Sequence, residues 1–347
     1  MNTSIAIDLL QGGWNALSAY LSAHVLTCLV PAFFIAGAIA VFISQASVLK
    51  YFGPQANKLL SYSVASVSGT ILAVCSCTVL PLFGGIYKRG AGIGPAVAFL
   101  YSGPAINILA IVYSARLLGY DLGAARAVGA IAFAAGIGLI MSLIYRKEQS
   151  LKDAEAFAAL SADPEGKKAW QQLALFAALV ALLIFAASQN WIAAGALLVA
   201  LGGILWRWFN RDEIGRWMRE TLRFARLIVP WLLVGVFAAG IITVIVPQDV
   251  VTTYVGANSL LANLVASFLG ALMYFATLTE VPIVRAFMDL GMGKGPALAL
   301  LLAGPALSLP NMLVIRSIMG VKKTLTYIAL VVAFATASGY IFGLVAP

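Results

Sequence analysis

Charged side chains are scarce in this sequence. Asp, Glu, Lys and Arg make up 10% of the 347 residues, against about 25% in soluble domains. Apolar residues make up 62%, and the mean hydropathy is +0.97. This composition excludes a soluble enzyme and a disordered chain. The net charge of +9 is explained below by where the charges lie, so no nucleic-acid partner is expected.

Cysteine is also scarce. Cys28, Cys75 and Cys77 are too few for a disulfide framework, and all three lie in apolar runs, so each is a buried small hydrophobe or a ligand. The sequence has no Walker loop, nucleophile elbow or HExxH motif, which argues against an ATPase or a hydrolase. We therefore expect no enzyme activity, no cofactor and no metal centre.

Long apolar runs dominate what is present. A transmembrane helix needs about 20 mostly apolar residues, and such runs predict an all-α polytopic membrane protein with about ten transmembrane helices in the lipid bilayer. The third and ninth runs contain Ser-Gly-Pro and Ala-Gly-Pro interruptions. The ten runs are approximately Leu21–Ile43, Leu59–Phe83, Gly94–Ala115, Leu122–Tyr145, Gln171–Ser188, Trp191–Trp208, Leu227–Pro247, Leu260–Val284, Pro296–Ile315 and Thr324–Leu344.

The basic residues predict an orientation, because cytoplasmic loops of membrane proteins carry an excess of Lys and Arg. With the N-terminus inside, fifteen Lys and Arg fall on the cytoplasmic side and seven on the other. We therefore expect both termini in the cytoplasm. The predicted divisions are a first repeat with four spans, a cytoplasmic linker, two connecting spans with a basic loop, and a second repeat with four spans. Their residues are 1–145, 146–170, 171–226 and 227–347.

The chain also matches itself. A shift of 201 residues pairs Leu60–Ile106 with Leu261–Leu307, and 17 of the 47 positions are identical. Matched glycines and prolines at corresponding places are typical of transporters whose broken helices meet near the membrane midplane. The predicted structural breaks are Pro81, Gly103, Pro104, Pro282, Gly304 and Pro305.

The span count sets the relation between the two repeats. With four spans per repeat and two between them, the repeats would run parallel. If a broken helix instead doubles back as a re-entrant hairpin, the count changes by one and the repeats become inverted. The sequence leaves both arrangements open.

The Cys-Ser-Cys run at 75–77 is the sharpest local feature. Pro81 lacks the N–H that would bond the Cys77 carbonyl, which favours unwinding. On unwound backbone Cys75 and Cys77 lie on the same side and would suit a soft, thiophilic ligand. The alternative is that both are small apolar packing residues.

In the second repeat, Glu280 stands at the position that corresponds to Val79 in the first repeat. An ionisable group at that depth is costly, which makes it a candidate for proton coupling. The alternative is a structural ion pair with Arg285 or Arg316.

Further polar residues follow the predicted breaks. We expect Pro104 and Pro305 to start half-helices whose positive N-terminal ends face the midplane, where Asn107 binds substrate oxygens or ties the broken helix to a neighbour. The candidate substrate-binding residues are Cys75, Ser76, Cys77, Thr78, Asn107, Thr279, Ser308 and Asn311.

Three runs carry a family resemblance: CSCTVLPL at 75–82, GIGPAVAFL at 92–100 and SGPAIN at 102–107. They resemble the predicted permease family that includes the bacterial organoarsenical efflux permeases. The resemblance implies an inner-membrane permease that exports trivalent organoarsenicals through contacts with Cys75 and Cys77. Cys28 does not belong to the motif.

The favoured interpretation is a secondary transporter for a small thiophilic molecule, in which Glu280 carries the coupling proton. One alternative is a facilitator for a small sulfur compound or a soft metal ion. Another is an intramembrane thiol-redox protein that uses Cys75 and Cys77 as a dithiol. The sequence leaves open whether the chain forms a homodimer.

Overall fold

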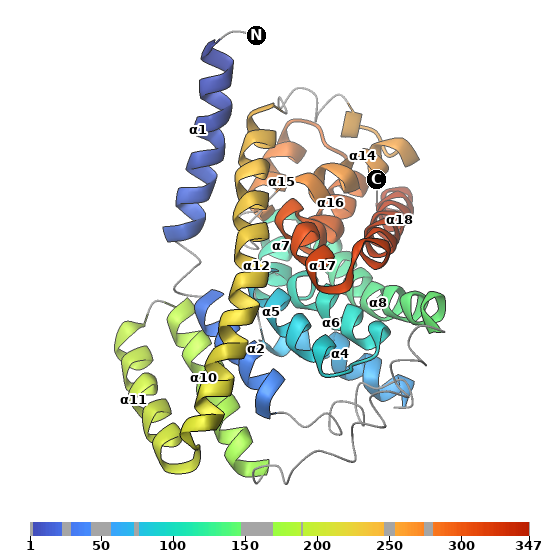
Figure 1. The fold of residues 1–347 in the computed structure, drawn as a ribbon. Helices are drawn as coiled ribbons and strands as arrows, with labels where there is room; N and C mark the ends of the chain where they lie inside the picture. The colour runs from blue at the N-terminus through green and yellow to red at the C-terminus, as the bar shows by residue number, and fades with distance from the viewer. Residues whose placement is uncertain are drawn as a thin grey trace.

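The computed structural model describes residues 3–22, 29–42, 57–72, 76–146, 169–188, 190–245, 254–273 and 280–346. Over these residues the chain is helical and contains no strand. The long helix α12 runs the height of the molecule, with α1 beside one end and α10 and α11 beside the other (Figure 1). The helices are α1 (Thr3–Tyr20), α2 (Val30–Phe42), α4 (Lys58–Leu72), α5 (Ser76–Lys88), α6 (Ile93–Ala105), α7 (Ile108–Leu118), α8 (Tyr120–Ile144), α10 (Ala169–Ala187), α11 (Trp191–Trp208), α12 (Arg211–Ile245), α14 (Leu260–Leu272), α15 (Glu280–Asp289), α16 (Lys294–Leu307), α17 (Leu309–Met319) and α18 (Val321–Val345).

The helices are long and apolar enough to confirm a helical membrane protein. Within the described residues, α8, α11, α12 and α18 could each cross a membrane, and the count rises to 6 if each bent pair is one span. The bent pairs are α6 with α7, at 47°, and α16 with α17, at 46°. The expected ten spans are therefore not confirmed in the described part of the chain, where several apolar runs divide into shorter helices.

Ion pairs and hydrogen bonds define two ends of the molecule. At the first, which we call the basic end, Lys88 forms an ion pair with Glu220 of α12, and the Lys323 Nζ lies 3.3 Å from the Tyr87 hydroxyl. At the opposite end, the Lys294 Nζ lies 3.3 Å from an Asp121 carboxylate oxygen. The helix bounds can be placed relative to these two ends.

The predicted span at 59–83 is wrong, because α4 and α5 form a pair that enters and leaves at the basic end. Gly94, at the start of α6, lies against Tyr62 of α4 and Gly138 of α8, while α5 ends at Lys88. The two helices have 15 and 13 residues, or about 22 and 20 Å at 1.5 Å per residue. Neither reaches across a core of about 30 Å.

The predicted span at 260–284 is wrong for the same reason at the opposite end. Asn258, just before α14, donates a hydrogen bond to the Tyr340 carbonyl near the end of α18 (3.1 Å) and lies against Gly295. Arg285 of α15 donates to the Leu117 carbonyl at the end of α7 (3.4 Å). Both α14 and α15 therefore have their outer ends opposite the basic end.

These two re-entrant pairs belong to helix sets that run in opposite directions. We call α4–α8 the first set and α14–α18 the second set. Adding 201 to the bounds of α8, 120 and 144, gives those of α18, 321 and 345, and the bounds of α7 and α17 are related in the same way. The first set's re-entrant pair opens at the basic end and the second set's at the opposite end, so the parallel arrangement is wrong.

Matching contacts join the two sets. Arg285 meets Leu117, and Gly84, 201 residues before Arg285, lies near Ile318, which is 201 residues after Leu117. The Tyr101 hydroxyl donates a hydrogen bond to the Leu302 carbonyl (3.1 Å). Leu302 is the residue that corresponds to Tyr101 by the shift of 201 positions. All of α6 and α16 except Lys294 is buried, so these two helices form the centre of the molecule, as expected for helices that are apolar on all sides.

The expected placement of both termini beside the Lys88 loop is also wrong. Lys323 lies at the basic end, so α18, with 25 residues, ends at the opposite end. Helix α1 packs on the last part of α12, where Gly12 meets Val244. The two re-entrant pairs account for the difference because neither crosses the membrane. The sequence prediction counts each as a span, and each such span reverses the side of the membrane expected for the residues after it.

Candidate functional site

Four helices begin inside the molecule. The outer ends of α5 and α15 are their C-terminal ends, and α7 and α17 start at the two bends. All four N-termini therefore face the interior, where their unsatisfied N–H groups carry a partial positive charge. The C-terminal ends of α4, α6, α14 and α16 reach the same interior, so the partial charges of the helix ends largely offset one another, and the N-termini supply local N–H donors.

The bends lie just after the predicted prolines. Pro104 and Pro305 sit in the last turns of α6 and α16 and do not start the following half-helices, which corrects the expectation. Each proline removes one hydrogen bond near a C-terminus, where the helix is already ending. The proline at the start of α17 is Pro310, which packs against Gly235 of α12.

Three of the predicted polar residues lie buried at these bends. Asn107 precedes α7 and is 6% exposed, while Ser308 and Asn311 at the start of α17 are each 2% exposed. The Asn311 Nδ2 donates to the Pro305 carbonyl (3.4 Å). Among the described residues, the Ser308 hydroxyl and the Asn311 Oδ1 have no hydrogen-bond partner, which leaves both free for a ligand.

The cysteine motif lies at the inner start of α5. Ser76 and Cys77 are its first two residues, and Thr78 is buried. The expected unwinding at Cys77 is absent, because α5 continues through Pro81 and loses only the one hydrogen bond that the proline cannot make. Cys75 and Thr279 lie outside the described residues. The Cys75–Cys77 geometry therefore stays a prediction.

Glu280 forms a buried ion pair that the sequence did not suggest. Its Oε1 accepts a hydrogen bond from the Nη2 of Arg126, and both side chains are 0% exposed. The Arg126 Nη1 donates to the Ser114 hydroxyl (2.8 Å). Arg126 is therefore the ion-pair partner of Glu280, in place of the Arg285 or Arg316 considered as the alternative. The Arg285 guanidinium instead pairs with Asp289 (2.9 Å).

The ion pair ties the two sets together. Arg126 lies on α8 and Ser114 on α7, while Glu280 is the first residue of α15. Glu280 is nine residues, or about 14 Å, from Asp289 at the outer end of α15, which is close to half the membrane core. Among the described residues, the Arg126 Nε and the Glu280 Oε2 have no hydrogen-bond partner.

Two tyrosines complete the central cluster. Tyr101 and Tyr327 are fully buried. The Tyr101 hydroxyl lies within electrostatic range of Arg126, and the two tyrosines interact in the same way. Sequence reasoning missed Arg126 because it lies near the end of a predicted span, where arginine usually reaches water. The shift of 201 residues pairs Arg126 with Tyr327. The available signal was that a charged residue stands where the other set has a tyrosine.

No group of three or more His, Cys, Asp or Glu side chains in the described part of the chain is arranged to hold a metal ion. The site is instead built from one ion pair, hydroxyl and amide groups, and helix N-termini.

Known proteins resemble the chain over nearly its whole length. A family model described as a predicted permease (ArsP_1) matches residues 11–344. The UPF0718 protein MJ0584 of Methanocaldococcus jannaschii is 47% identical over 349 residues, which cover 95% of each chain. The UPF0718 protein YraQ of Escherichia coli is 26% identical over 272 residues, which cover 78% of this chain and 63% of YraQ. No solved structure gives a significant match.

Proposed function

The chain belongs to the predicted permease family, and from this premise we propose that it is a secondary transporter of the inner membrane. It exports trivalent organoarsenicals or a similar thiophilic small molecule, and a proton carried by Glu280 drives the export. The observation that carries the proposal is the buried pair of Glu280 and Arg126, which joins two helix sets of opposite direction.

The two sets act as inverted repeats that rock against each other. The bounds of α7 and α17, and those of α8 and α18, differ by 201 residues, and the Tyr101 hydroxyl donates to the carbonyl of its counterpart Leu302 where the sets meet. Inverted repeats with broken helices at mid-depth are the usual basis of alternating access. The substrate site then lies where the four helix N-termini converge, and the two sets expose it to each side in turn.

The residues at the inner helix starts supply the substrate contacts. Cys75 and Cys77 bind the soft atom as thiolates, with Ser76, Thr78 and Thr279 beside them. Asn107, Ser308 and Asn311 bind substrate oxygens. The burial of these three residues and the unpartnered Ser308 hydroxyl and Asn311 Oδ1 support this assignment.

Glu280 couples transport to the proton gradient. While its carboxylate is ionised, the pair with Arg126 holds α15 against α7 and α8. Protonation removes the negative charge and with it most of the attraction, so α15 separates and the pathway to the opposite end opens. Deprotonation closes it again.

The charge distribution gives the orientation. Besides Lys88 and Lys323, the basic end carries the exposed arginines of the first half of α12, and such an excess belongs on the cytoplasmic side. The α18 C-terminus then faces away from the cytoplasm, which replaces the expected cytoplasmic termini. Export runs from the basic end to the opposite end.

Uptake into everted membrane vesicles tests the proposal. Vesicles with the wild-type chain should accumulate methylarsenite when a proton gradient is imposed, and an uncoupler should abolish the accumulation. Cys75→Ser/Cys77→Ser should lose accumulation because the soft ligands are gone, and Glu280→Gln should lose its dependence on the gradient. Cys28→Ser is the matched control and should transport normally.

Two outcomes would redirect the proposal. Wild-type protein that is folded and inserted but accumulates no methylarsenite would discard the arsenical substrate. Transport that survives in Cys75→Ser/Cys77→Ser would remove the thiols from the site and favour a substrate that is not thiophilic.

A further inference from the structure

The charge balance around Arg126 carries an inference that rests on the proposed protonation of Glu280. Among the described residues, Arg126, Glu280 and Lys323 are the buried side chains that can carry a charge, and Lys323 lies at the basic end beside Tyr87. Within the described interior, Glu280 is the one acidic side chain that balances Arg126.

The surroundings of Arg126 offer it neutral groups. Four helix N-termini face the same interior together with the C-terminal ends of α4, α6, α14 and α16, so the helix dipoles largely offset one another. Ser114 offers Arg126 a neutral oxygen, and the Tyr101 hydroxyl lies within electrostatic range of it. If Glu280 takes up a proton, a fully buried guanidinium is left without a counter-charge, and an uncompensated buried charge is strongly destabilising.

The remaining charged and titratable groups near α15 cannot take over from Glu280. They lie on the helices that pack against α15, they are exposed or half-buried at the opposite end, and Lys294 and Asp121 pair with each other. They are Tyr113 and Arg116 on α7, Lys294 on α16, Asp121 on α8, and Arg285 and Asp289 on α15 itself.

The geometry of the pair leaves some of its hydrogen-bonding atoms unused among the described residues. Only one Glu280 oxygen and one Arg126 nitrogen are joined, and the Arg126 Nε has no partner among the described residues. A buried pair that served only to hold the fold would be expected to use both carboxylate oxygens and both facing guanidinium nitrogens. The free Nε is a donor of the kind that completes a two-point contact with an oxyanion.

We infer that Arg126 is the binding site of a small anion, which takes the place of the Glu280 carboxylate when Glu280 is protonated. One proton from the aqueous phase binds a Glu280 oxygen, no other bond forms or breaks, and the anion restores neutrality at Arg126. The anion is a small inorganic ion that moves with the proton while the substrate moves the other way, because an exported anion that bound the protonated site would carry the driving proton out with it. A neutral substrate by itself cannot supply this charge.

Thermal unfolding of the purified full-length protein in detergent tests the site without a transport assay. The probes are sodium thiosulfate and sodium chloride, compared with sodium gluconate at equal ionic strength. In Glu280→Gln the site is permanently without its carboxylate, so either probe should raise the unfolding midpoint by about 3 °C or more when it is well above its Kd. In the wild type the rise should be larger in acid than in alkaline buffer.

Matched variants separate binding from general salt effects. Arg126→Gln/Glu280→Gln removes the guanidinium as well as the carboxylate and should show no difference between probe and gluconate. A response to chloride, with or without thiosulfate, identifies a small inorganic anion that moves with the proton. A response to thiosulfate alone would show that the substrate moves with the proton, and it would contradict proton-driven export.

The inference is overturned if Glu280→Gln responds to the probes no more than the double variant does. Should Glu280→Gln fail to fold, a wild-type response that is independent of pH overturns it equally. Neither result affects the vesicle experiment with Cys75→Ser/Cys77→Ser, so the proposed function and the anion site fail separately.

Discussion

The two helix sets place opposite chemistry at matching positions. Between the centre and the opposite end, the space is filled by an ion pair with a hydroxyl, from Arg126, Glu280 and Ser114. Between the centre and the basic end, the residues that correspond to these three by the shift of 201 positions are two aliphatic side chains and a tyrosine. All of them are at most 1% exposed. They are Val79, Ile315 and Tyr327.

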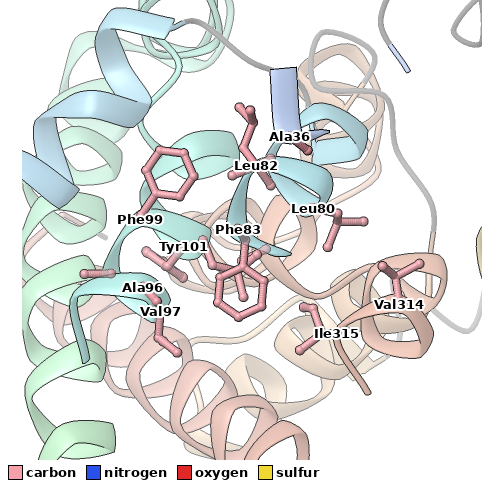
Figure 2. Packing of buried hydrophobic residues seen from close by; sticks show 14 of the residues in the cluster. Ala36, Leu80, Leu82, Phe83, Ala96, Val97, Phe99, Tyr101, Val314 and Ile315 are labelled. Carbon is pink, nitrogen blue, oxygen red and sulfur yellow. The ribbon is translucent and has the colours of Figure 1, made fainter. Parts of the chain in front are cut away.

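The apolar side is packed as an ordinary core. Figure 2 shows Leu80 and Phe83 of α5 with Val314 and Ile315 of α17 among the buried apolar side chains. Contacts of this kind do not depend on protonation, whereas the ion pair does. In the proposed mechanism, this difference at corresponding backbone positions lets a proton act on one end of the molecule alone, which an exact repeat could not do.

Removing one member of the ion pair should have the largest effect. Arg126→Gln leaves the Glu280 carboxylate buried without a counter-charge, and we expect a loss of about 3 to 5 kcal/mol in stability. The matched change on the apolar side, Tyr327→Phe, removes only a 3.5 Å hydrogen bond to the Ala306 carbonyl and should cost about 1 kcal/mol. Unfolding midpoints and yields of monodisperse protein in detergent measure both. Equal losses would show that the pair has no special weight.

Making the charged side apolar should recover most of that loss. In Arg126→Met/Glu280→Leu neither charge is buried, and replacing a buried pair with apolar groups is often neutral or stabilising by about 1 to 4 kcal/mol. We expect a midpoint near the wild-type value, well above that of Arg126→Gln, together with complete loss of gradient-driven uptake in vesicles. A double variant as unstable as Arg126→Gln would contradict the assigned pairing.

The contrast between the two sides bears on what the sequence could predict. The register of glycines and prolines predicted corresponding helices, and the described bounds of α8 and α18 agree with the shift of 201 residues. The mid-depth position of Glu280 was predicted too. An ionisable side chain at that depth is costly to bury, and depth can be counted along the chain.

Other features could not be predicted, because they depend on contacts between distant segments. Arg126 lies 154 residues from Glu280, and nothing in the local pattern of 120–144 separates an arginine that reaches water from one that turns inward. The apolar runs at 59–83 and 260–284 have the composition of full spans. Only the contacts at Gly94 and Asn258 show that these runs turn back.

Moving the ion pair to the apolar side should have an intermediate effect. Val79→Glu places a carboxylate in the position that corresponds to Glu280, and it should destabilise the protein because the new charge is buried and unpaired. Adding Tyr327→Arg supplies the corresponding cation, and we expect it to restore about 1 to 2 kcal/mol. Val79→Gln/Tyr327→Arg is the control and should show no such recovery. Unfolding midpoints of the variants measure the coupling, and strictly additive losses would mean that the two sets are not equivalent here.

The smallest expected effect distinguishes the glycines that precede α8 and α18. Gly119 and Gly320 have φ of 114° and 85°, a region where a side chain costs about 1 kcal/mol or more, so alanine should destabilise both. A Cβ on Gly119 would lie 2.6 Å from the Asp121 carboxylate, whereas one on Gly320 meets nothing within 4 Å. Gly119→Ala therefore also displaces the partner of Lys294, and it should lower the unfolding midpoint slightly more than Gly320→Ala. The exposed pair of Lys294 and Asp121 is worth at most about 1 kcal/mol and is screened by salt. The part of the difference in unfolding midpoint that comes from this pair should therefore disappear at high ionic strength. A difference that salt leaves unchanged would have to come from steric displacement alone.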